Sequence, residues 1–320
     1  MLRRHFCQAC LFELLCVEGA YAKQNLTLEN KTEDENTLFT SDSLINLIKA
    51  DTAFADCSNL LFPAGNTAGL SLRDVGRLLP YHTNVQPDEA AAVLNYLKAE
   101  KEKGEQIFYP LIKSSQGTPN AGLFFFRGKP GNRFAVICPG GGFRYVGAIH
   151  EGFPLAMYLA SQGINAFVIV YRVGGADIAC RDLAQGIDFI FEHAAELKVS
   201  TKNYSLWGGS AGARMAAYLG SYSPTSFGGT TSQRPSAVIM QYTGHTDIGG
   251  QEPATYAVVG DADPIANPDT MEWRINQLKR SGVPTKFNLI HGISHGFGLG
   301  TRSPAEGWAR DALDFWLLQK

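Results

Sequence analysis

The sequence contains one serine in a setting that suits a catalytic nucleophile. Gly208 to Gly212 read G-G-S-A-G, which places Ser210 in a G-x-S-x-G motif between an apolar segment, residues 204–207, and an alanine-rich segment, residues 211–219. A serine on an abrupt strand-to-helix turn leaves no room for neighbouring side chains, so the flanking glycines have a steric purpose. Free N–H groups at the start of the following helix also favour negative charge beside the serine. We therefore predict that Ser210 is a nucleophile.

A second glycine-rich segment suits the charge that forms when a serine attacks a carbonyl. Residues 134–138 are apolar and are followed by a proline and three consecutive glycines at positions 140 to 142. Backbone N–H groups in such a loop are free to point at a ligand oxygen. We predict an oxyanion hole formed by the N–H groups of Gly141, Gly142 and Ala211, in which one donor contributes about 3 kcal/mol. The alternative interpretation is a flexible loop.

Two aspartates compete for the role of the acid in a triad. Asp261 and Asp263 both follow the apolar segment at residues 255–259. We predict that Asp263 is the acid, because it lies two residues deeper in the loop, in a G-x-x-D arrangement. Asp261 is better placed to hydrogen-bond the turn as an Asx residue, and it is the alternate candidate.

Two histidines compete in the same way for the role of the general base. His291 and His295 follow the last apolar segment. We predict that His295 is the base, because it lies in the loop proper beside Gly296, whereas His291 belongs to the strand end and is expected to pack or cap there. Serine, acid and histidine then occur in the chain order of a hydrolase triad. The remaining histidines lack this context and are expected to be ordinary surface or core residues: His82, His150, His193 and His245.

Alternating strands and helices must position these residues. Predicted strands cover residues 106–112, 122–126, 134–138, 166–171, 204–207, 237–242, 255–259 and 285–290. Predicted helices cover residues 151–162, 177–197, 211–219, 268–280 and 305–318. Short strands that are apolar on both faces and separated by helices predict a mostly parallel sheet with helices on both faces. The functional residues should then lie where strands end and helices begin.

The N-terminal third differs from this pattern. Residues 1–41 are predicted to be a leader, either a signal or a disordered segment, because residues 23–41 are polar. A cytoplasmic location is favoured, since Glu13 and Glu18 interrupt the apolar stretch, and secretion is expected if residues 1–22 act as a signal peptide. Residues 42–105 show helical periodicity and are predicted to form a helical N-terminal extension or cap. Residues 106–320 are predicted to form the catalytic domain.

Composition excludes several classes of function. Charged residues make up 18% and the formal net charge is -2, so no broad basic face is available for a nucleic acid. The six cysteines lack the paired spacing of a zinc site. Motifs for a metalloprotease, a phosphate-binding loop or a dinucleotide site are missing from the sequence. We therefore expect no cofactor, no metal, no nucleic-acid partner and no stable membrane insertion, and we expect a small-molecule ester as the substrate.

Several motifs together resemble a known superfamily. They are F-A-V-I-C-P-G-G-G-F at residues 134–143, His150-Glu151-Gly152, Tyr171-Arg172 and the turn at Ser210. Over residues 122–319 the chain resembles esterases of the α/β-hydrolase superfamily, in particular the acetyl esterase and feruloyl esterase-like group related to hormone-sensitive lipases. The sequence departs from that pattern at Pro139, where many relatives have histidine, and at Arg214, where relatives often have a small residue or histidine. The oxyanion loop is thus expected to be held differently.

The resemblance implies an α/β-hydrolase fold and a serine carboxylic-ester hydrolase that acts on short-chain acyl esters, including acetyl groups on carbohydrates. The reaction would proceed through an acyl-enzyme. Two alternatives are a serine peptidase or amidase of the same fold, and a catalytically inactive α/β-hydrolase that serves as a binding module.

Overall fold

The computed structural model describes residues 38–319, and the chain from Phe39 onward forms one compact unit. The leader predicted for residues 1–41 therefore lies outside the described residues except for its last four positions. Among residues 38–319, no helix combines the length and the apolar character needed to cross a membrane.

Eight strands form one sheet. They are β1 (Phe108–Lys113), β2 (Pro119–Phe126), β3 (Arg133–Cys138), β4 (Asn165–Val170), β5 (Ser200–Gly209), β6 (Ala237–Gln241), β7 (Ala254–Gly260) and β8 (Thr285–Ile290). Their order across the sheet is β1-β2-β4-β3-β5-β6-β7-β8. β2 pairs antiparallel with both β1 and β4, whereas all other neighbours are parallel. The mostly parallel sheet predicted from the sequence is confirmed.

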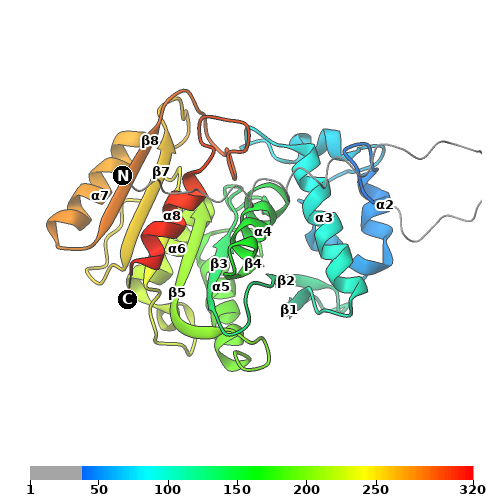
Figure 1. Ribbon diagram of the computed structural model, residues 1–320, viewed down its shortest axis with the longest axis horizontal. Helices are drawn as coiled ribbons and strands as arrows, with labels where there is room; N and C mark the ends of the chain where they lie inside the picture. Colours follow the sequence, from blue (N-terminus) through cyan, green and yellow to red (C-terminus); the bar gives the residue numbers. More distant parts are fainter. Residues whose placement is uncertain (1–37, 320) are drawn as a thin grey trace, which may run out of the picture. The chain divides into compact units, whose positions relative to one another are not determined.

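Helices cover both faces of this sheet. They are the π-type turn η5 (Ala148–Gly152), α4 (Phe153–Ser161), α5 (Ala176–Glu192), α6 (Ala211–Tyr222), the short η6 (Pro224–Phe227), α7 (Pro268–Arg280) and α8 (Trp308–Leu317). Figure 1 shows α4 and α8 in front of the sheet and α5 and α6 behind it. Side chains of a strand alternate between the two faces. In β5, Trp207 accordingly packs against Trp308 and Trp316 of α8. Tyr204, on the other face, packs against Phe191 of α5.

Several predicted helix boundaries differ from the structure for local reasons. The helix predicted from residue 151 begins at Phe153, because η5 precedes it and directs the Glu151 carboxylate to the backbone N–H of Gly140. The helix predicted from residue 305 begins at Trp308, because Gly307 has a φ of 93°, which an α-helix does not accept. The helix predicted to reach residue 197 ends at Glu192.

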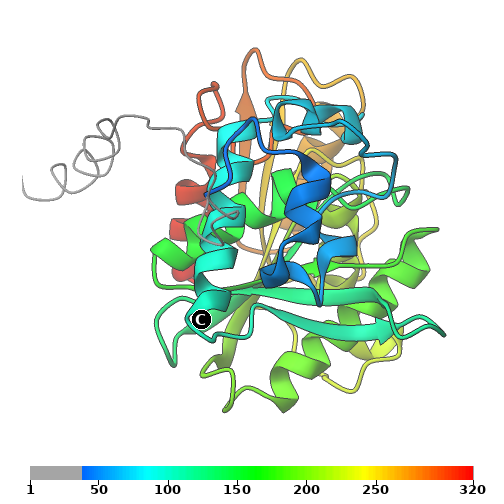
Figure 2. The same cartoon turned by 90° about the vertical axis from the view of Figure 1, so that its right-hand side faces the viewer.

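Residues 39–105 contain two α-helices and three short 3-10 helices. These are α2 (Ile45–Ala50), η2 (Thr52–Phe54), η3 (Ser58–Leu60), η4 (Leu72–Leu78) and α3 (Pro87–Glu102). Figure 2 shows α2 and α3 above the antiparallel β1–β2 pair. α3 contacts α4, and η3 contacts β2. The segment between η4 and α3 reaches the loop after β8, where the Thr83 N–H donates to the Gly296 carbonyl at 3.0 Å.

Candidate active site

Ser210 lies on a strained turn between β5 and α6. Its backbone has a φ of 52° and a ψ of -114°, which side-chain-bearing residues seldom adopt. A Cβ on Gly208 would lie 2.4 Å from the carbonyl carbon of Gly212, and a Cβ on Gly212 would lie 1.8 Å from the carbonyl oxygen of Cys138. Both distances are collisions with backbone, so this turn requires both glycines of the motif.

The structure brings Ser210, His295 and Asp263 together. The Oγ of Ser210 lies 3.0 Å from Nε2 of His295, and Nδ1 of the same ring lies 2.8 Å from Oδ2 of Asp263. The His295 side chain is 3% exposed and that of Asp263 is fully buried. With its hydrogen on Nδ1, the ring donates to the carboxylate and its Nε2 accepts from the serine hydroxyl. This is the geometry of a nucleophile, a base and an orienting acid.

The second oxygen of Asp263 fixes the carboxylate to its own loop. Its Oδ1 accepts hydrogen bonds from the backbone N–H groups of Ile265 and Ala266, each at 2.8 Å. The Asx role predicted for Asp261 is therefore wrong, because Asp263 makes these local turn bonds. One oxygen of Asp263 anchors the turn and leaves the other for His295.

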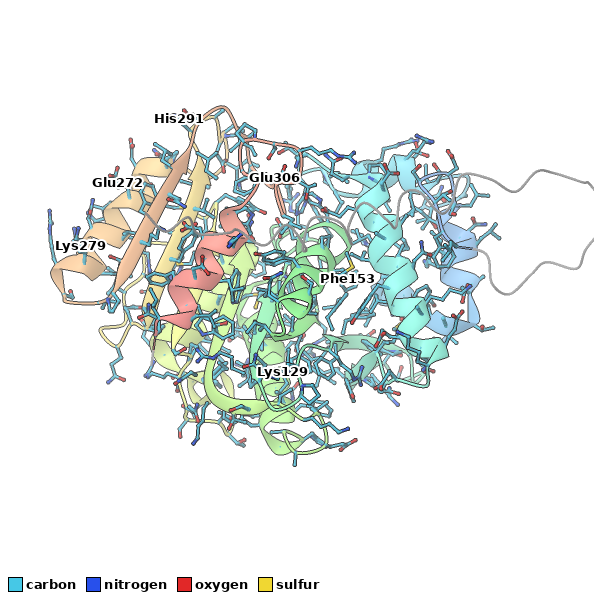
Figure 3. The ribbon with its side chains drawn as sticks, in the orientation of Figure 1. Lys129, Phe153, Glu272, Lys279, His291 and Glu306 are labelled. Atoms are coloured by element: carbon cyan, nitrogen blue, oxygen red, sulfur yellow. The ribbon has the colours of Figure 1, made fainter. Side chains whose placement is uncertain are left out.

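His291 and Asp261 form a separate, exposed pair. Nδ1 of His291 lies 2.7 Å from Oδ2 of Asp261, and the histidine side chain is 84% exposed. Figure 3 places His291 at the outer end of the loop after β8. The hydrogen bond from His291 and another from the Gly292 N–H lower the pKa of Asp261 from its ordinary value. The expectation that His291 packs or caps is wrong, since the side chain extends into solvent.

The predicted oxyanion loop lies against the serine turn. A Cβ on Gly140 would lie 3.0 Å from Cβ of Ser210. Gly141 and Gly142 have φ values of 130° and 62°, and a Cβ on Gly141 would lie 2.2 Å from the carbonyl oxygen of Tyr145. Within residues 38–319, no protein acceptor is hydrogen-bonded to the N–H groups of Gly141, Gly142 or Ala211. No protein acceptor among these residues therefore competes with a ligand oxygen for the three N–H groups.

Two hydrogen bonds hold the first residues of the predicted oxyanion loop, Pro139 and Gly140. The hydroxyl of Tyr171 donates to the carbonyl oxygen of Pro139 at 2.8 Å. The N–H of Gly140 donates to the carboxylate of Glu151. Side chains from η5 and the end of β4 thus hold the start of the loop at Pro139 and Gly140.

Sequence reasoning missed a buried carboxylate cluster beside the serine turn, formed by Glu151, His82 and Tyr242. Glu151 is 2% exposed and accepts from the Tyr242 hydroxyl at 2.8 Å. Nε2 of His82 lies 2.8 Å from Oε1 of Glu151. The Tyr242 ring also packs against the His295 ring, with centroids 4.8 Å apart. The H-E-G motif was the available signal for Glu151, whereas no sequence signal connected His82, expected to be an ordinary surface or core residue and here buried, with this carboxylate.

The surroundings of the carboxylate in this cluster favour its ionised form. Burial alone would raise the pKa of Glu151, but attraction to His82 and hydrogen bonds from Gly140 and Tyr242 overcome that effect and lower it to about 2. Since this folded-state pKa lies below the ordinary 4.5, the ionised carboxylate stabilises the fold above pH 4.5. That contribution is lost as the pH falls towards 2.

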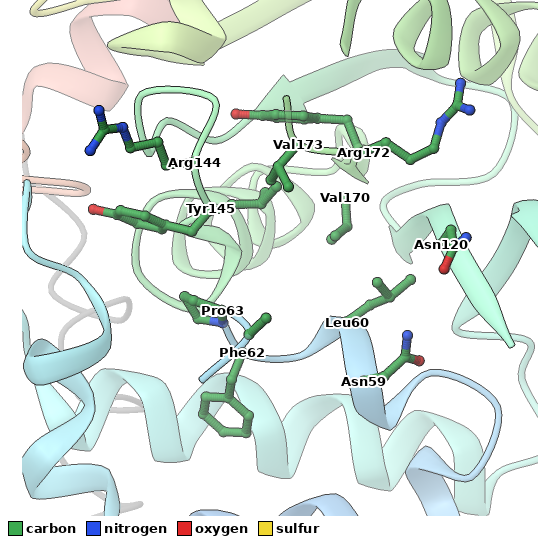
Figure 4. Close-up of a pocket in the computed structure, with 13 residues that line it drawn as sticks. Asn59, Leu60, Phe62, Pro63, Asn120, Arg144, Tyr145, Val170, Arg172 and Val173 are labelled. Atoms are coloured by element: carbon green, nitrogen blue, oxygen red, sulfur yellow. The ribbon is translucent and has the colours of Figure 1, made fainter. Parts of the chain in front are cut away.

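A cavity of about 460 Å³ lies beside the oxyanion loop. Its lining residues come from the loop after the glycines, from the end of β4 and from the N-terminal segment: Asn59, Leu60, Phe62, Pro63, Ala64, Asn120, Arg144, Tyr145, Val146, Val170, Tyr171, Arg172 and Val173. Figure 4 shows Tyr145, Leu60 and Val170 around the cavity, with Asn59 and Asn120 on one side. Ser210 does not line the cavity, which therefore adjoins the serine site instead of containing it.

Comparisons with known sequences find similarity to esterases over part of the chain. Residues 135–268 match the family model described as BD-FAE. An acetylxylan esterase of Xylanibacter ruminicola is 30% identical over 102 residues, which are 31% of this chain. The chain spans only about a fifth (21%) of the length of that curated relative. The predicted resemblance to α/β-hydrolase esterases is confirmed over the matched segment.

Solved structures share the fold. An acetyl ester-xyloside bifunctional hydrolase from Caldicellulosiruptor lactoaceticus superposes with a TM-score of 0.56 at 18% identity, covering 66% of this chain and 95% of that one. A thermophilic esterase from Thermogutta terrifontis gives a TM-score of 0.56 at 19% identity, covering 66% and 91%. An α/β hydrolase from a Medee basin deep-sea metagenome gives 0.55 at 18% identity, covering 65% and 95%. The predicted α/β-hydrolase fold is confirmed.

Proposed function

We propose that this chain, which has the α/β-hydrolase fold, is a serine carboxylic-ester hydrolase. The single observation that carries the proposal is the connected series of hydrogen bonds from Ser210 through His295 to Asp263. A serine hydroxyl is a weak nucleophile unless an adjacent base removes its proton. Here the base is buried, oriented by a buried carboxylate, and adjacent to N–H groups that have no protein acceptor among the described residues.

The reaction then proceeds in two halves. The Oγ of Ser210 attacks the ester carbonyl while Nε2 of His295 takes its proton, and the N–H groups of Gly141, Gly142 and Ala211 stabilise the oxyanion. The tetrahedral intermediate expels the alcohol, which takes the proton from His295 and leaves an acyl-serine. In the second half, His295 deprotonates a water that attacks this ester. The second tetrahedral intermediate breaks its bond to Ser210, His295 returns the proton to the Ser210 Oγ, and the acid leaves. No cofactor takes part in any of these steps.

We propose short acyl groups, including acetyl groups on carbohydrates, as the substrate class. The proposal is supported by the names of two relatives, an acetylxylan esterase and an acetyl ester-xyloside hydrolase. It is also supported by the cavity beside the oxyanion loop, which combines aromatic and amide side chains. Aromatic faces and amide groups suit the carbon–hydrogen faces and the hydroxyl groups of a sugar. We place the alcohol portion of the ester in this cavity.

Hydrolysis of a series of 4-nitrophenyl esters tests the proposed function. We expect kcat/KM for the acetate and butyrate to exceed that for the decanoate by at least about tenfold, because the extra methylenes of a long acyl chain must find space in a site built for a short one. A fluorophosphonate probe should also label Ser210, since it reacts with activated serines. Lack of turnover on every ester, together with lack of labelling, would reject the proposal.

Filling the cavity tests the proposed position of the alcohol. Val173 lines the cavity and is 48% exposed, so Val173→Trp should reduce the cavity without disturbing the core. We expect KM for an acetylated xylo-oligosaccharide to rise about tenfold, as is common when a pocket contact is replaced by a clash. KM for 4-nitrophenyl acetate should change less than about twofold. Ile178→Trp is the matched control, because Ile178 is 37% exposed and lies outside the cavity. Equal effects on both substrates would contradict this placement.

A further inference from the structure

The N-terminal segment directly contacts both loops of the proposed site. The hydroxyl of Thr83 donates to the carbonyl oxygen of His295 at 2.7 Å, and the Thr83 N–H donates to the Gly296 carbonyl at 3.0 Å. One residue earlier, Nδ1 of His82 lies 2.9 Å from the hydroxyl of Tyr145, in the loop that follows the oxyanion glycines. Residues 82 and 83 therefore connect the histidine loop with the oxyanion loop.

The ring of His82 lies beside the buried carboxylate of Glu151 and directs its Nε2 atom towards it. Its side chain is 1% exposed, as is that of Glu151, and Nε2 lies 2.8 Å from Oε1. An ionised carboxylate can only accept hydrogen, so Nε2 carries its proton at this distance. The N–H is not aligned for a hydrogen bond, which leaves an electrostatic contact between the two groups. Two further rings contact that of His82: His150 meets it edge-on with centroids 5.4 Å apart, and the Tyr145 ring lies at 5.7 Å.

The Glu151 carboxylate lies near the position where negative charge develops during ester hydrolysis. A Cβ on Gly140 would lie 3.0 Å both from Oε2 of Glu151 and from Cβ of Ser210, so the carboxylate and the serine flank the same glycine. An uncompensated anion here would oppose the oxyanion, because charges interact strongly in a buried site. A positively polarised group beside the carboxylate would reduce that opposition while the carboxylate still holds the N–H of Gly140.

Glycines in the oxyanion loop and in the histidine loop leave space for His82. A Cβ on Gly147 would lie 2.8 Å from Cε1 and Nε2 of the His82 ring, and a Cβ on Gly296 would lie 2.7 Å from the Cα of His82. Gly296 also has a φ of 69°, which favours glycine. Side chains at these two positions would therefore displace the histidine from the carboxylate.

We propose that His82 is a positioning residue of the esterase site: delivered by the N-terminal segment, it offsets the charge of Glu151 and so keeps the oxyanion loop in its catalytic position. The inference rests on the proposed function, since it gives His82 a part in the same reaction. It makes residues 42–105 a component of the active site and not a removable cap.

The central variant is His82→Gln, measured by steady-state hydrolysis of 4-nitrophenyl acetate. We expect kcat to fall about 10- to 100-fold, because small misplacements of oxyanion donors have effects of this size. KM should change less than about threefold, since the oxyanion contacts strengthen only in the transition state. His193→Gln, at the end of α5, is the control and should retain full activity, because its Nδ1 contacts only the Phe189 carbonyl within its own helix.

The double variant His82→Gln/Glu151→Gln tests whether His82 acts by offsetting the charge of Glu151 or only by filling space. Removing one partner leaves a buried, unpaired carboxylate, whereas removing both does not. We therefore expect the double variant to recover at least about fivefold in kcat relative to His82→Gln. A kcat for His82→Gln within twofold of the unmodified protein, or a double variant no faster than His82→Gln, would overturn the proposal.

Two further measurements keep the inference testable if His82→Gln folds poorly or the protein hydrolyses no ester. Gly147→Ala retains His82 but displaces its ring, and it should reproduce the loss of kcat. Hydrogen exchange at residues 140–147 needs no turnover and should be faster in either variant than in the unmodified protein. Unchanged exchange would overturn the positioning role. Absence of ester turnover in the unmodified protein would instead reject the proposed function.

Discussion

Ser210→Ala is expected to give a folded protein whose kcat for ester hydrolysis is lower by at least about a thousandfold. The Oγ of Ser210 makes one hydrogen bond, to His295, so its removal leaves no other buried group without a partner. The backbone turn should survive, because alanine carries the same Cβ as serine at a φ of 52° and the two flanking glycines are unchanged. What is lost is the atom that forms the acyl-enzyme in the proposed mechanism.

The measurement combines kcat for 4-nitrophenyl acetate with thermal unfolding and fluorophosphonate labelling. We expect an unfolding midpoint close to that of the unmodified protein and no labelling. Ser226→Ala is the matched control, since Ser226 is exposed and its hydroxyl donates only to the Tyr222 carbonyl within one helical turn. Turnover by Ser210→Ala within tenfold of the unmodified protein would remove Ser210 from the mechanism.

The two histidine–aspartate pairs are expected to respond in opposite ways to the same substitutions. His295→Gln should lower kcat at least about a thousandfold at every pH, because glutamine cannot take the serine proton. Asp263→Asn should lower kcat at least about a hundredfold, since an amide favours the wrong tautomer of the ring. His291→Gln and Asp261→Asn should each retain kcat within about twofold, because that pair is exposed and does not contact Ser210.

The pH dependence of kcat/KM separates the two histidines further. Only a neutral imidazole can accept the proton of Ser210, so we expect kcat/KM to fall along an acidic limb of the pH profile. His291→Gln should retain this acidic limb with the same midpoint. If His291→Gln abolished turnover while His295→Gln retained it, the base would lie in the exposed pair and the proposed mechanism would be wrong.

The serine turn could be predicted from the sequence because its constraints are local. The collisions that exclude side chains from Gly208 and Gly212 involve backbone within a few residues of Ser210 or at the end of the neighbouring strand β3. The alternation of short apolar strands with helices similarly predicted the mostly parallel sheet, since burial of both faces leaves a pattern in every strand. Helix ends were less predictable. The start of α4, for example, depends on η5, in which Glu151 accepts a hydrogen bond from Gly140 of a different loop.

Sequence spacing alone did not determine which histidine and which aspartate lie beside the serine. The two pairs have nearly the same separation along the chain and nearly the same distance, 2.7 Å for His291–Asp261 and 2.8 Å for His295–Asp263. Their order and residue types are identical. Tertiary packing distinguishes them, because the loop around His295 is held against the N-terminal segment by Thr83, whereas His291 extends into solvent.

The sequence by itself determined the fold class, the serine turn and the glycine-rich loop, because each depends on residues that are neighbours in the chain or on a repeated pattern of burial. Only the tertiary structure decided which residues surround them. The contact of His82 with Glu151 joins the N-terminal segment to η5, and Tyr242 joins the same carboxylate to the His295 ring. Contacts between distant segments leave no periodic signal, since they arise only when the folded chain brings those segments together.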